Sequence, residues 1–281
     1  MSEKLNIGLV GFGVVGEGVY NVIINTPSLQ ATVKKIAIKH PEKQRNAPSE
    51  LFTSDVNELL YDENIDIIVE LIDDAEEAFW IVRMAMEQKK HVVSANKKMI
   101  AWHLPELIEL QRTYQVSFLY EAAVCASIPI LRNLEEYFDN DLLHALSGIV
   151  NGSTNFILTK MNQQGWPYNK ALLEAQRLGF AESDPALDVE GYDAVNKLTI
   201  LLKHTFGIDC HPSEVYVHGI TTIKSVDTQF AKEKRLEIKL VANTFRISND
   251  QVVAFVLPQF VPGIHPFHRV MNEYNAVLIS S

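Results

Sequence analysis

The stretch "LNIGLVGFGVVGEGVYNVIINT", residues 5 to 26, decides the fold of the first half of this chain. It begins as an apolar strand, turns at Gly11, Gly13 and Gly16, and continues with valine and isoleucine at helical spacing. Glycines in such a turn let the backbone approach a pyrophosphate, and the helix that follows offers free N–H groups to its oxygens. Because the turn lies between a first strand and a helix, it predicts dinucleotide binding, and a plain tight turn is the alternative.

The pattern beyond this stretch alternates between short apolar strands and amphipathic helices up to about residue 130. Such alternation predicts an α/β fold, a Rossmann-like doubly wound parallel sheet in a domain that spans residues 1–130. The expected strands cover residues 33–39, 65–72, 91–95 and 116–122, and the expected helices cover residues 54–61, 75–88 and 104–115.

The second half of the chain has a different order of elements, which predicts a second, α+β domain over residues 131–269. A strand at 142–150 and helices that begin near residues 151, 168 and 192 precede three apolar strands, at 214–221, 236–245 and 252–260. Few helical signals lie between those three strands. We expect the last segment, about residues 270–281, to form a strand that returns to the first domain.

The composition excludes several classes of partner. Of the 281 residues, 47% are hydrophobic and the formal net charge is −10, so the chain is globular and has no basic face for nucleic acid or an anionic membrane. No apolar run reaches the roughly 20 residues of a membrane span. Two cysteines, and a start "MSEKLNIGLVGFG" that lacks the shape of a secretory signal, predict a cytoplasmic protein that acts on a small molecule.

Basic residues follow the second expected strand, where dinucleotide-binding folds recognise the ribose. An acidic residue at this point holds the ribose 2′-hydroxyl of NAD, but the segment "IKHPEKQR" supplies Lys39, Lys43 and Arg45 instead. These cations suit the 2′-phosphate of NADP, so NADP is favoured over NAD, and a solvated basic loop is the alternative. Lys97 follows the strand "HVV" at the carboxyl edge of the sheet, where it either reaches a ligand or lies exposed to solvent.

The stretch "DPALDVEGYDAVNK", residues 184–197, places several carboxylates and one lysine around the start of an apolar helix. Asp193 and Lys197 are spaced i, i+4, so their side chains lie on one helix face a turn apart. A surface ion pair is the plain interpretation, but the helix is apolar around much of its girth, and buried charges need partners or a ligand. Glu182, Asp184 and Asp188, in the preceding loop, can point toward the same place.

Carboxylates beside a lysine suit a small substrate that carries an ammonium group and a reacting oxygen. The carboxylates would neutralise the ammonium, and the lysine would act on the oxygen as an acid or as a charge stabiliser. Oxygen ligands alone also bind Mg²⁺ or Ca²⁺, but the loop lacks the alternate-position spacing of a calcium-binding loop. Substrate binding is therefore favoured over a metal site.

Several segments together resemble the homoserine dehydrogenase family over nearly the whole chain. The run "AQRLGFAESDPALDVEGYDAVNK" is similar to the signature of that family, and the other segments are "GFGVVG", "VVSANK", "YEAAVCASIPIL" and "GIVNGSTNFIL". The resemblance implies the single-function enzyme, which interconverts L-aspartate 4-semialdehyde and L-homoserine with NAD(P) in threonine and methionine biosynthesis. It also implies that the second domain binds the substrate, carries catalytic residues and forms a homodimer.

The resemblance also assigns roles to individual residues of the site. Lys197 would give a proton to the aldehyde oxygen with the support of Asp188, and Lys97 would lie near both nicotinamide and substrate. Glu182 and Asp193 would hold the substrate ammonium group. The implied catalytic residues are Lys197, Asp193, Asp188 and Lys97, the implied substrate-binding residues are Glu182, Gly152 and Ser153, and the implied cofactor-binding residues are Gly11, Phe12, Gly13, Val14, Val15, Gly16, Lys39, Ser94 and Lys97.

The segment "EAAVCASI", residues 121–128, is similar to a monovalent-cation site of the family. The resemblance implies that the Glu121 side chain and the backbone carbonyls of Val124, Ala126 and Ile128 bind a sodium ion. A buried strand end is the alternative interpretation of this segment.

Three features depart from the family pattern. Asp73 and Asp74 stand where the family commonly has two glycines, and their charges would repel a cofactor phosphate unless the loop bends away. Ser127 stands where the family usually has a glycine, which adds a side chain at a point of close backbone approach in the family. The end of the chain lacks the glycine-rich segment that completes the nucleotide domain of the family, so we expect a shortened protein that is weakly active or dependent on dimerisation.

Two alternatives to a working homoserine dehydrogenase follow. One is a truncated, inactive homologue that binds a dinucleotide without turnover. The other is aspartate-semialdehyde dehydrogenase chemistry, which needs an activated cysteine, and Cys125 is the candidate. No histidine lies close to Cys125 in the sequence, so this last hypothesis ranks low.

Overall fold

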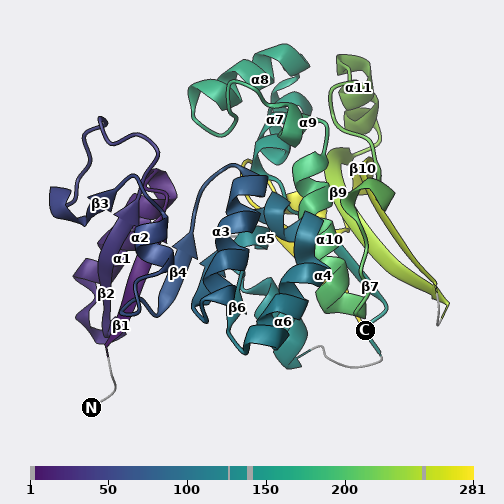
Figure 1. Ribbon diagram of the computed structural model, residues 1–281. Coiled ribbons are helices and arrows are strands. Elements are labelled where there is room, and N and C mark those ends of the chain that lie inside the picture. Colours follow the sequence, from purple (N-terminus) through teal and green to yellow (C-terminus); the bar gives the residue numbers. More distant parts are fainter. Residues whose placement is uncertain (1–3, 126, 138–141, 249–250) are drawn as a thin grey trace. The chain divides into compact units, whose positions relative to one another are not determined.

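The computed structural model describes residues 4–125, 127–137, 142–248 and 251–281. The chain forms two compact units, Met1–Ala123 and Val124–Ser281, each with its own sheet (Figure 1). The boundary falls inside helix α5 (Ala122–Cys125), somewhat earlier than the expected boundary at residue 130. Within the described ranges, no helix is both long and apolar enough to cross a membrane.

The first unit contains the predicted doubly wound sheet, with strands in the order β3-β2-β1-β4-β5-β6. All neighbouring strands are parallel, so their carboxyl ends meet at one edge of the sheet. The strands are β1 (Leu5–Val10), β2 (Ala31–Ala37), β3 (Phe52–Thr53), β4 (Ile67–Glu70), β5 (His91–Ser94) and β6 (Phe118–Leu119). The helices are α1 (Val14–Asn25), α2 (Asn57–Leu60), α3 (Ala75–Glu87) and α4 (Lys97–Tyr114), with short 3-10 helices at Pro27–Leu29 and Ser49–Leu51.

The core of this unit explains why β1 and α1 form where the opening stretch predicts them. Leu9 and Ile36 are fully buried in neighbouring strands, and Tyr20 of α1 packs into the same cluster. Each such side chain contributes roughly 1.5–3 kcal/mol when it leaves water. The apolar side chains that recur along α1 at the helical period therefore pack against the sheet, as the sequence predicts.

Helix α4 begins earlier than predicted, at Lys97 rather than near residue 104. The predicted helix covered only residues 104–115, the later part of the observed one. The actual start is set by Asn96, whose Oδ1 accepts a hydrogen bond from the Met99 N–H at 3.0 Å, and the helix continues through Pro105. Lys97 is thus the first residue of a helix and not part of a loop.

The second unit contains the predicted α+β arrangement, with a sheet in the order β11-β7-β9-β10-β8. Its strands are β7 (Ala145–Ile149), β8 (Tyr216–Val217), β9 (Leu236–Ser248), β10 (Gln251–Pro262) and β11 (Ala276–Ser280). Its helices are α6 (Ile130–Tyr137), α7 (Gly152–Gln164), α8 (Tyr168–Arg177), α9 (Ala186–Val189), α10 (Tyr192–Phe206) and α11 (Ser225–Glu233), with 3-10 helices at Pro212–Glu214 and Pro266–Arg269. Long β9 and β10 pair in antiparallel fashion and form the centre of the sheet.

Helix α11 lies between two strands where no helix was expected. Only Thr228 and Ala231 of this helix are buried, while Val226 and Phe230 are exposed. A helix with so small a buried face leaves a weak periodic signal in the sequence. Its first turn is stabilised locally, because the Asp227 carboxylate accepts the N–H of Lys224 at 2.8 Å.

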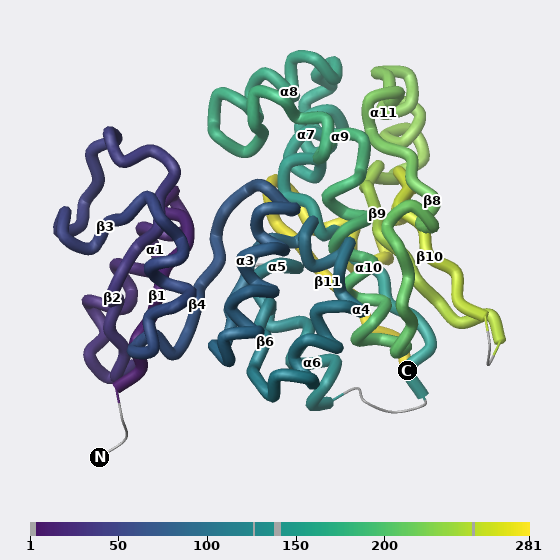
Figure 2. Tube along the Cα trace, viewed as in Figure 1, coloured from purple at the N-terminus to yellow at the C-terminus, as the bar shows by residue number. Residues whose placement is uncertain are grey.

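The expectation that the last strand returns to the first unit is wrong. Strand β11, which is labelled in Figure 2, pairs in antiparallel fashion with β7 of the second sheet. The preceding segment is fixed in the same unit, because the Lys239 ammonium donates to the Val270 carbonyl at 2.6 Å and the Asn155 amide donates to the Tyr274 carbonyl at 3.1 Å. These contacts direct the chain onto the open edge of β7.

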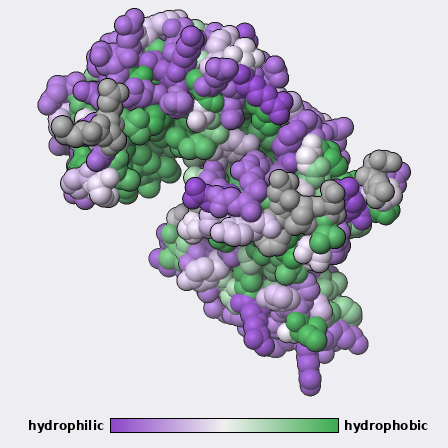
Figure 3. All heavy atoms as spheres, turned by 90° about the horizontal axis from the view of Figure 1, so that it is seen from below, coloured by the Kyte–Doolittle hydropathy of each residue, from purple (hydrophilic) through white to green (hydrophobic). Residues whose placement is uncertain are grey.

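Hydrophobic residues reach the surface at several places between hydrophilic ones, as the face in Figure 3 shows. Exposed apolar residues on the strands of the second sheet include Phe245, Ile247, Phe260 and Leu278. One sheet thus carries several apolar side chains that its own unit leaves in contact with solvent.

Candidate active site

The glycine turn between β1 and α1 is shaped by close backbone contacts. Gly11 has φ +97°, and a Cβ there would lie 2.8 Å from the Leu71 carbonyl oxygen. A Cβ at Gly16 would overlap the carbonyl oxygen of Gly11. A Cβ at Gly13, by contrast, would meet nothing within 4 Å, and its φ of −84° suits any residue. The fold therefore explains the glycines at 11 and 16, and the open space above Gly13 fits the close approach of a ligand.

The amino terminus of α1 is open and carries no side-chain cap. The N-cap residue is Gly13, which has no side chain that could cap the helix. Val14 is 92% exposed, and Val15 is also exposed. An uncapped helix start presents N–H groups and a partial positive charge, which fit a diphosphate. The ring of Phe12 packs against the core, with the rings of Tyr20 and Phe52 at centroid distances of 5.7 and 5.2 Å.

Lys39 lies just beyond the carboxyl end of β2, where the sequence placed the ribose. Its side chain is 75% exposed, and Nζ is 3.6 Å from the Glu77 carboxylate. Arg45, in the same loop, donates to the backbone carbonyl of Lys43 at 2.7 Å. An exposed ammonium near this strand end fits a phosphate on the ribose, but Glu77 competes for it.

The carboxyl ends of β4 and β5 are joined by a closed ring of hydrogen bonds around Glu70. The Glu70 carboxylate accepts the Ile72 N–H at 2.7 Å and the Ser94 hydroxyl at 2.5 Å. Ser94 Oγ accepts the Asn96 N–H at 3.1 Å, and the Asn96 amide donates to the Ile72 carbonyl at 3.0 Å. We call these residues, Glu70, Ile72, Ser94 and Asn96, the strand-end ring. It fixes the start of α4, and therefore the position of Lys97.

Glu70 is the fully buried member of this ring, with 0% of its surface exposed. Burial raises the pKa of its carboxyl to about 7, against the opposing effect of the hydrogen bonds from Ser94 and Ile72. The negative charge of Asp73 raises the pKa further. A carboxyl group whose pKa is raised by burial thus lies at the edge of the sheet that binds ligands in such folds.

The two aspartates after β4 differ in what they do. Asp74 caps α3, because its carboxylate accepts the Glu77 N–H at 2.9 Å. Asp73 is exposed. Capping of α3 thus explains an aspartate at position 74. Asp73, by contrast, is an exposed negative charge near the strand ends.

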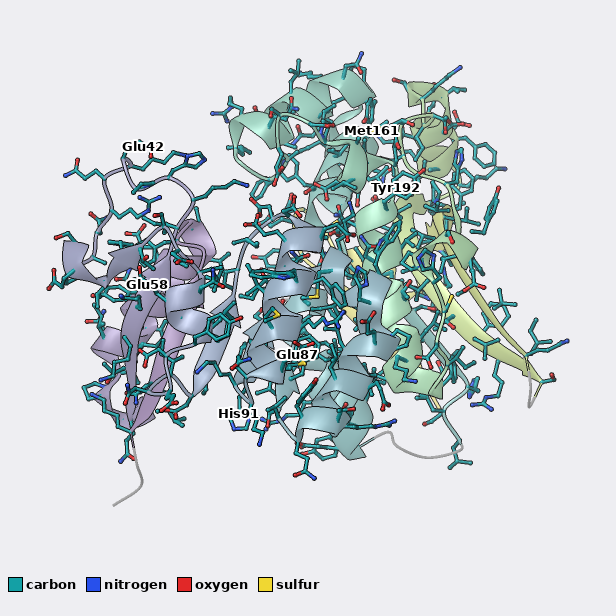
Figure 4. The ribbon with its side chains drawn as sticks, viewed as in Figure 1. Glu42, Glu58, Glu87, His91, Met161 and Tyr192 are labelled. Atoms are coloured by element: carbon teal, nitrogen blue, oxygen red, sulfur yellow. The ribbon has the colours of Figure 1, made fainter. Side chains whose placement is uncertain are left out.

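The ion pair predicted in the second unit is buried. Lys197 and Asp193 lie on α10, which starts at Tyr192 (Figure 4), and Nζ is 2.7 Å from Asp193 Oδ2. The side chain of Lys197 is 14% exposed and that of Asp193 is 4% exposed. Nζ also donates to the Val150 carbonyl at 2.8 Å. A surface ion pair is therefore excluded, because both partners lie largely out of water.

Asn151 joins this pair to the preceding loop. Its amide nitrogen donates to Asp188 Oδ1 at 2.7 Å and to Asp193 Oδ2 at 2.8 Å. Its Oδ1 accepts the Thr154 N–H at 2.8 Å and so caps α7. One buried amide thus holds two carboxylates next to the lysine and starts a helix, and we call Lys197, Asp193, Asn151 and Asp188 the lysine cluster.

The residues expected on the substrate side, Gly152, Ser153 and Glu182, lie in the same two chain segments as Asn151 and Asp188. A Cβ at Gly152 would lie 2.7 Å from the Glu273 carbonyl oxygen, so the close contact with the last segment requires glycine there. The Ser153 hydroxyl donates to the carbonyl of Phe180, which ties the start of α7 to the loop that carries Glu182. Glu182 itself is exposed. The structure brings Lys197, Asp193 and Asp188 into one network, while Glu182 lies on the surface of the same unit.

The expected cation site is described only in part. Glu121 and Val124 lie on either side of the boundary between the two units, and Ala126 lies outside the described residues. The Ile128 carbonyl accepts the Ile130 N–H at 2.8 Å. Among the side chains that the structure describes, no group of three or more His, Cys, Asp or Glu residues could hold a metal ion. Cys125, the candidate nucleophile of the third hypothesis, is a buried free thiol and not accessible from solvent.

Sequence reasoning missed three residues that organise these sites, namely Glu70, Asn96 and Asn151. Both asparagines stand directly before a helix, which is a recognised N-cap signal. Glu70 is a lone charge at the end of the apolar strand "IIVE", and an isolated charge in a buried strand is a signal for a partnered group.

The comparisons with known proteins agree over nearly the whole chain. The model of the homoserine dehydrogenase family matches residues 129–281, and that of the homoserine dehydrogenase NAD binding domain matches residues 11–121. Homoserine dehydrogenase of Bacillus subtilis (strain 168) is 38% identical, over 99% of this chain and 66% of that protein.

Solved structures give the same result. A homoserine dehydrogenase from Thiobacillus denitrificans has a TM-score of 0.93 at 35% identity, over 98% of this chain and 65% of that one. A hyperthermophilic archaeal homoserine dehydrogenase in complex with NADPH has a TM-score of 0.83 at 26% identity, over 98% of this chain and 87% of that one. This chain thus spans about two thirds of the length of its Bacillus relative. With a match to both family models and an NAD-binding fold in its first unit, the chain belongs to the homoserine dehydrogenase family.

Proposed function

We propose that this protein is an NADP(H)-dependent oxidoreductase that interconverts L-aspartate 4-semialdehyde and L-homoserine, in threonine and methionine biosynthesis. The observation that carries the proposal is the buried Lys197–Asp193 pair, in a chain of the homoserine dehydrogenase family. Because Nζ is held by Asp193 and by the Val150 carbonyl, it has a fixed position before substrate arrives. A preorganised ammonium of this kind stabilises charge that develops on a carbonyl oxygen.

In the proposed reaction, the residues of the chain handle charge and protons. When bound, the nicotinamide supplies the hydride. Lys197 stabilises the developing alkoxide and gives it a proton, and Lys97 lies near nicotinamide and substrate. Asp193 Oδ2 already accepts hydrogen bonds from Lys197 and Asn151, so this oxygen orients the lysine. Asp188 supports the cluster through Asn151. Glu182, together with Asp193, binds the substrate ammonium beside Gly152 and Ser153.

The proposed cofactor is NADP rather than NAD. The ammonium of Lys39, which is exposed just beyond the carboxyl end of β2, supports this preference, because folds of this kind bind the ribose at the end of the second strand. The backbone from Gly11 to Gly16 would bind the diphosphate, and Ser94 would contribute from the end of β5. We further propose a sodium ion on Glu121, Val124, Ala126 and Ile128.

We propose that the protein acts in the cytoplasm as a homodimer formed through its second unit. Two observations support this arrangement. The second sheet exposes apolar side chains, among them Phe245 and Phe260, that a partner would cover. Both cysteines, Cys125 and Cys210, are free thiols, as expected for a reducing compartment.

The test is turnover of purified protein with L-aspartate 4-semialdehyde and NADPH or NADH, followed through the absorbance of the reduced nicotinamide. We expect oxidation of NADPH, and we expect Lys197→Ala to lose turnover by about 100-fold or more while NADPH fluorescence still reports binding. Lys203→Ala is the matched control, because Lys203 is a lysine of the same helix that pairs with Asp209 at 2.8 Å. Full turnover in Lys197→Ala would contradict the assignment. NADPH binding without turnover in the wild-type protein would favour the inactive homologue.

A further inference from the structure

Lys239 of β9 is a fully buried lysine whose hydrogen-bond partners are neutral groups. Its ammonium donates to the Val270 carbonyl at 2.6 Å and to Asn155 Oδ1 at 3.3 Å. The negative charge of Glu237 favours the ammonium, but within the described ranges no carboxylate forms an ion pair with Lys239. A buried charge of this kind is costly, and an apolar side chain of similar volume is often as stable or more so. Stability of the sheet alone therefore does not explain a lysine at this position.

Lys239 binds a segment that one face of α7 also binds. Gly152, Asn155 and Thr159 follow one another at spacings of three and four residues, so they lie on the same side of the helix. Residues 270–274, which we call the anchored segment, pack against this side. Asn155 Nδ2 donates to the carbonyls of the first and last residues of the segment, at 3.2 and 3.1 Å, and Thr159 Oγ1 accepts the N–H of the middle residue at 3.0 Å.

The anchored segment touches the proposed substrate side at Gly152. A Cβ on Gly152 would lie 2.7 Å from the Glu273 carbonyl oxygen, so the two backbones are in direct contact. Gly152 follows Asn151 of the lysine cluster and precedes Ser153 in the first turn of α7. A shift of the segment therefore changes the space beside that turn. In a binding site, a misplacement of about 1 Å can cost up to about 100-fold in activity.

We propose that Lys239 is a positioning residue, whose buried ammonium holds the anchored segment against the first turn of α7 and so fixes the substrate-binding geometry at Gly152 and Ser153. The inference deepens the proposed function and rests on it. Lys197 is held separately, by hydrogen bonds that involve no residue of the anchored segment. Loss of the Lys239 ammonium therefore weakens substrate binding more than it slows the transfer of the proton.

The experiment is the variant Lys239→Met, in which the ammonium is replaced by an unbranched apolar side chain. Steady-state kinetics with L-aspartate 4-semialdehyde and NADPH are measured on the full chain. We expect KM for the semialdehyde to rise about tenfold, as the loss of one hydrogen bond from a charged group implies, and kcat to stay within about threefold of the wild type. The Kd for NADPH, which binds in the first unit, should not change.

Lys90→Met is the matched control. Lys90 is also a buried lysine that donates to two backbone carbonyls, those of Asp62 at 2.6 Å and Ile65 at 2.8 Å, but all three residues belong to the first unit. It should lose stability for the same reason as Lys239→Met and keep the wild-type KM. Thr159→Val removes another bond of the anchored segment and leaves Lys239 in place, so we expect KM to rise about threefold.

Hydrogen exchange measured by mass spectrometry reports on the anchored segment without any need for turnover. The backbone amides of residues 270–275 should exchange about tenfold or more faster in Lys239→Met than in the wild type. In Lys90→Met their exchange should be unchanged. Both variants are compared well below their thermal midpoints, so that global unfolding does not contribute.

Three kinetic results would overturn the inference: an unchanged KM in folded Lys239→Met, a fall in kcat at unchanged KM, or an equal rise of KM in Lys90→Met. The last result would mean that general destabilisation explains the effect. If Lys239→Met does not fold, as judged by circular dichroism, KM in Thr159→Val decides. Absence of turnover in the wild-type protein would refute the proposed function itself, and hydrogen exchange then decides the role of Lys239.

Discussion

Asn151 provides the sharpest test of the lysine cluster, because it has two functions that different substitutions separate. Its amide nitrogen bridges Asp188 and Asp193, and its Oδ1 caps α7 through the Thr154 N–H. Serine is as good an N-cap as asparagine but has no amide to reach the carboxylates. Asn151→Ser therefore removes the bridge alone, and Asn151→Ala removes both the bridge and the cap.

The expected size of the effect follows from the geometry. The two carboxylate oxygens lie 2.7 and 2.8 Å from Asn151 Nδ2, so they are at most about 5.5 Å apart. Two like charges about 5 Å apart repel by roughly 3 kcal/mol at an effective dielectric constant of about 20, and the Asn151 amide and the Lys197 ammonium together offset this repulsion. Hydrogen bonds to charged groups contribute about 1.5–3 kcal/mol each, and water replaces part of this in the variant. We expect Asn151→Ser to lower the free energy of unfolding by about 2–4 kcal/mol, and Asn151→Ala by about 1 kcal/mol more.

The assay is urea unfolding followed by circular dichroism, combined with steady-state kinetics. Asn64→Ala is the control, because Asn64 is an exposed asparagine bonded to Asp62 within its own turn, at 2.9 Å, and should change stability by no more than about 0.5 kcal/mol. In kinetics we expect Asn151→Ser to lower kcat more than it raises KM, since it disturbs the orientation of the lysine. Wild-type stability in Asn151→Ser would refute the bridging role, and equal loss in both variants would refute the capping role.

The other predictions concern the cofactor turn, its specificity and a buried lysine. Gly13→Ala should fold normally, because its Cβ meets nothing within 4 Å, yet weaken NADPH binding about tenfold or more, while Gly16→Ala should instead lower the thermal midpoint. Lys39→Glu should reduce the preference for NADPH over NADH about tenfold in Kd, and wild-type selectivity in this variant would contradict the ribose assignment. Burial lowers the pKa of Lys239 to about 8, so the unfolded chain binds more protons between about pH 8 and 10.5 and stability should rise with pH across that window. Lys239→Met should remove this rise, as urea midpoints measured at pH 8 and pH 10 would show.

Much of the fold could be predicted because local patterns coincide with tertiary contacts. The opening stretch has an apolar strand, a glycine turn and a helical period, and each becomes an element of the first unit. The Asp193–Lys197 spacing likewise predicts a shared helix face, and the buried pair on α10 agrees with it. These features are local, since the backbone geometry within one turn or one strand fixes which side chains meet.

The errors lie where long-range contacts decide. The strand at the end of the chain carries apolar residues that could join either sheet, and only the anchoring of the preceding segment by Lys239 and Asn155 selects β7 as its partner. Helix α11 was not predicted because it buries little apolar surface, so its apolar residues show only a weak helical period. A strand can pair with any open edge of suitable register, so its sequence does not name its partner.

By itself, the sequence determined that this chain has a dinucleotide-binding unit followed by an α+β unit with a lysine and an aspartate on one helix. Period, glycine spacing and motif order suffice for that, because they are properties of neighbouring residues. Only the tertiary structure decided that the pair is out of water, that Asn151 bridges Asp193 to Asp188, and that Glu70 closes a ring with Ser94. Those facts depend on which side chains from distant segments are buried together. A buried charge needs a partner, and its burial shifts its pKa.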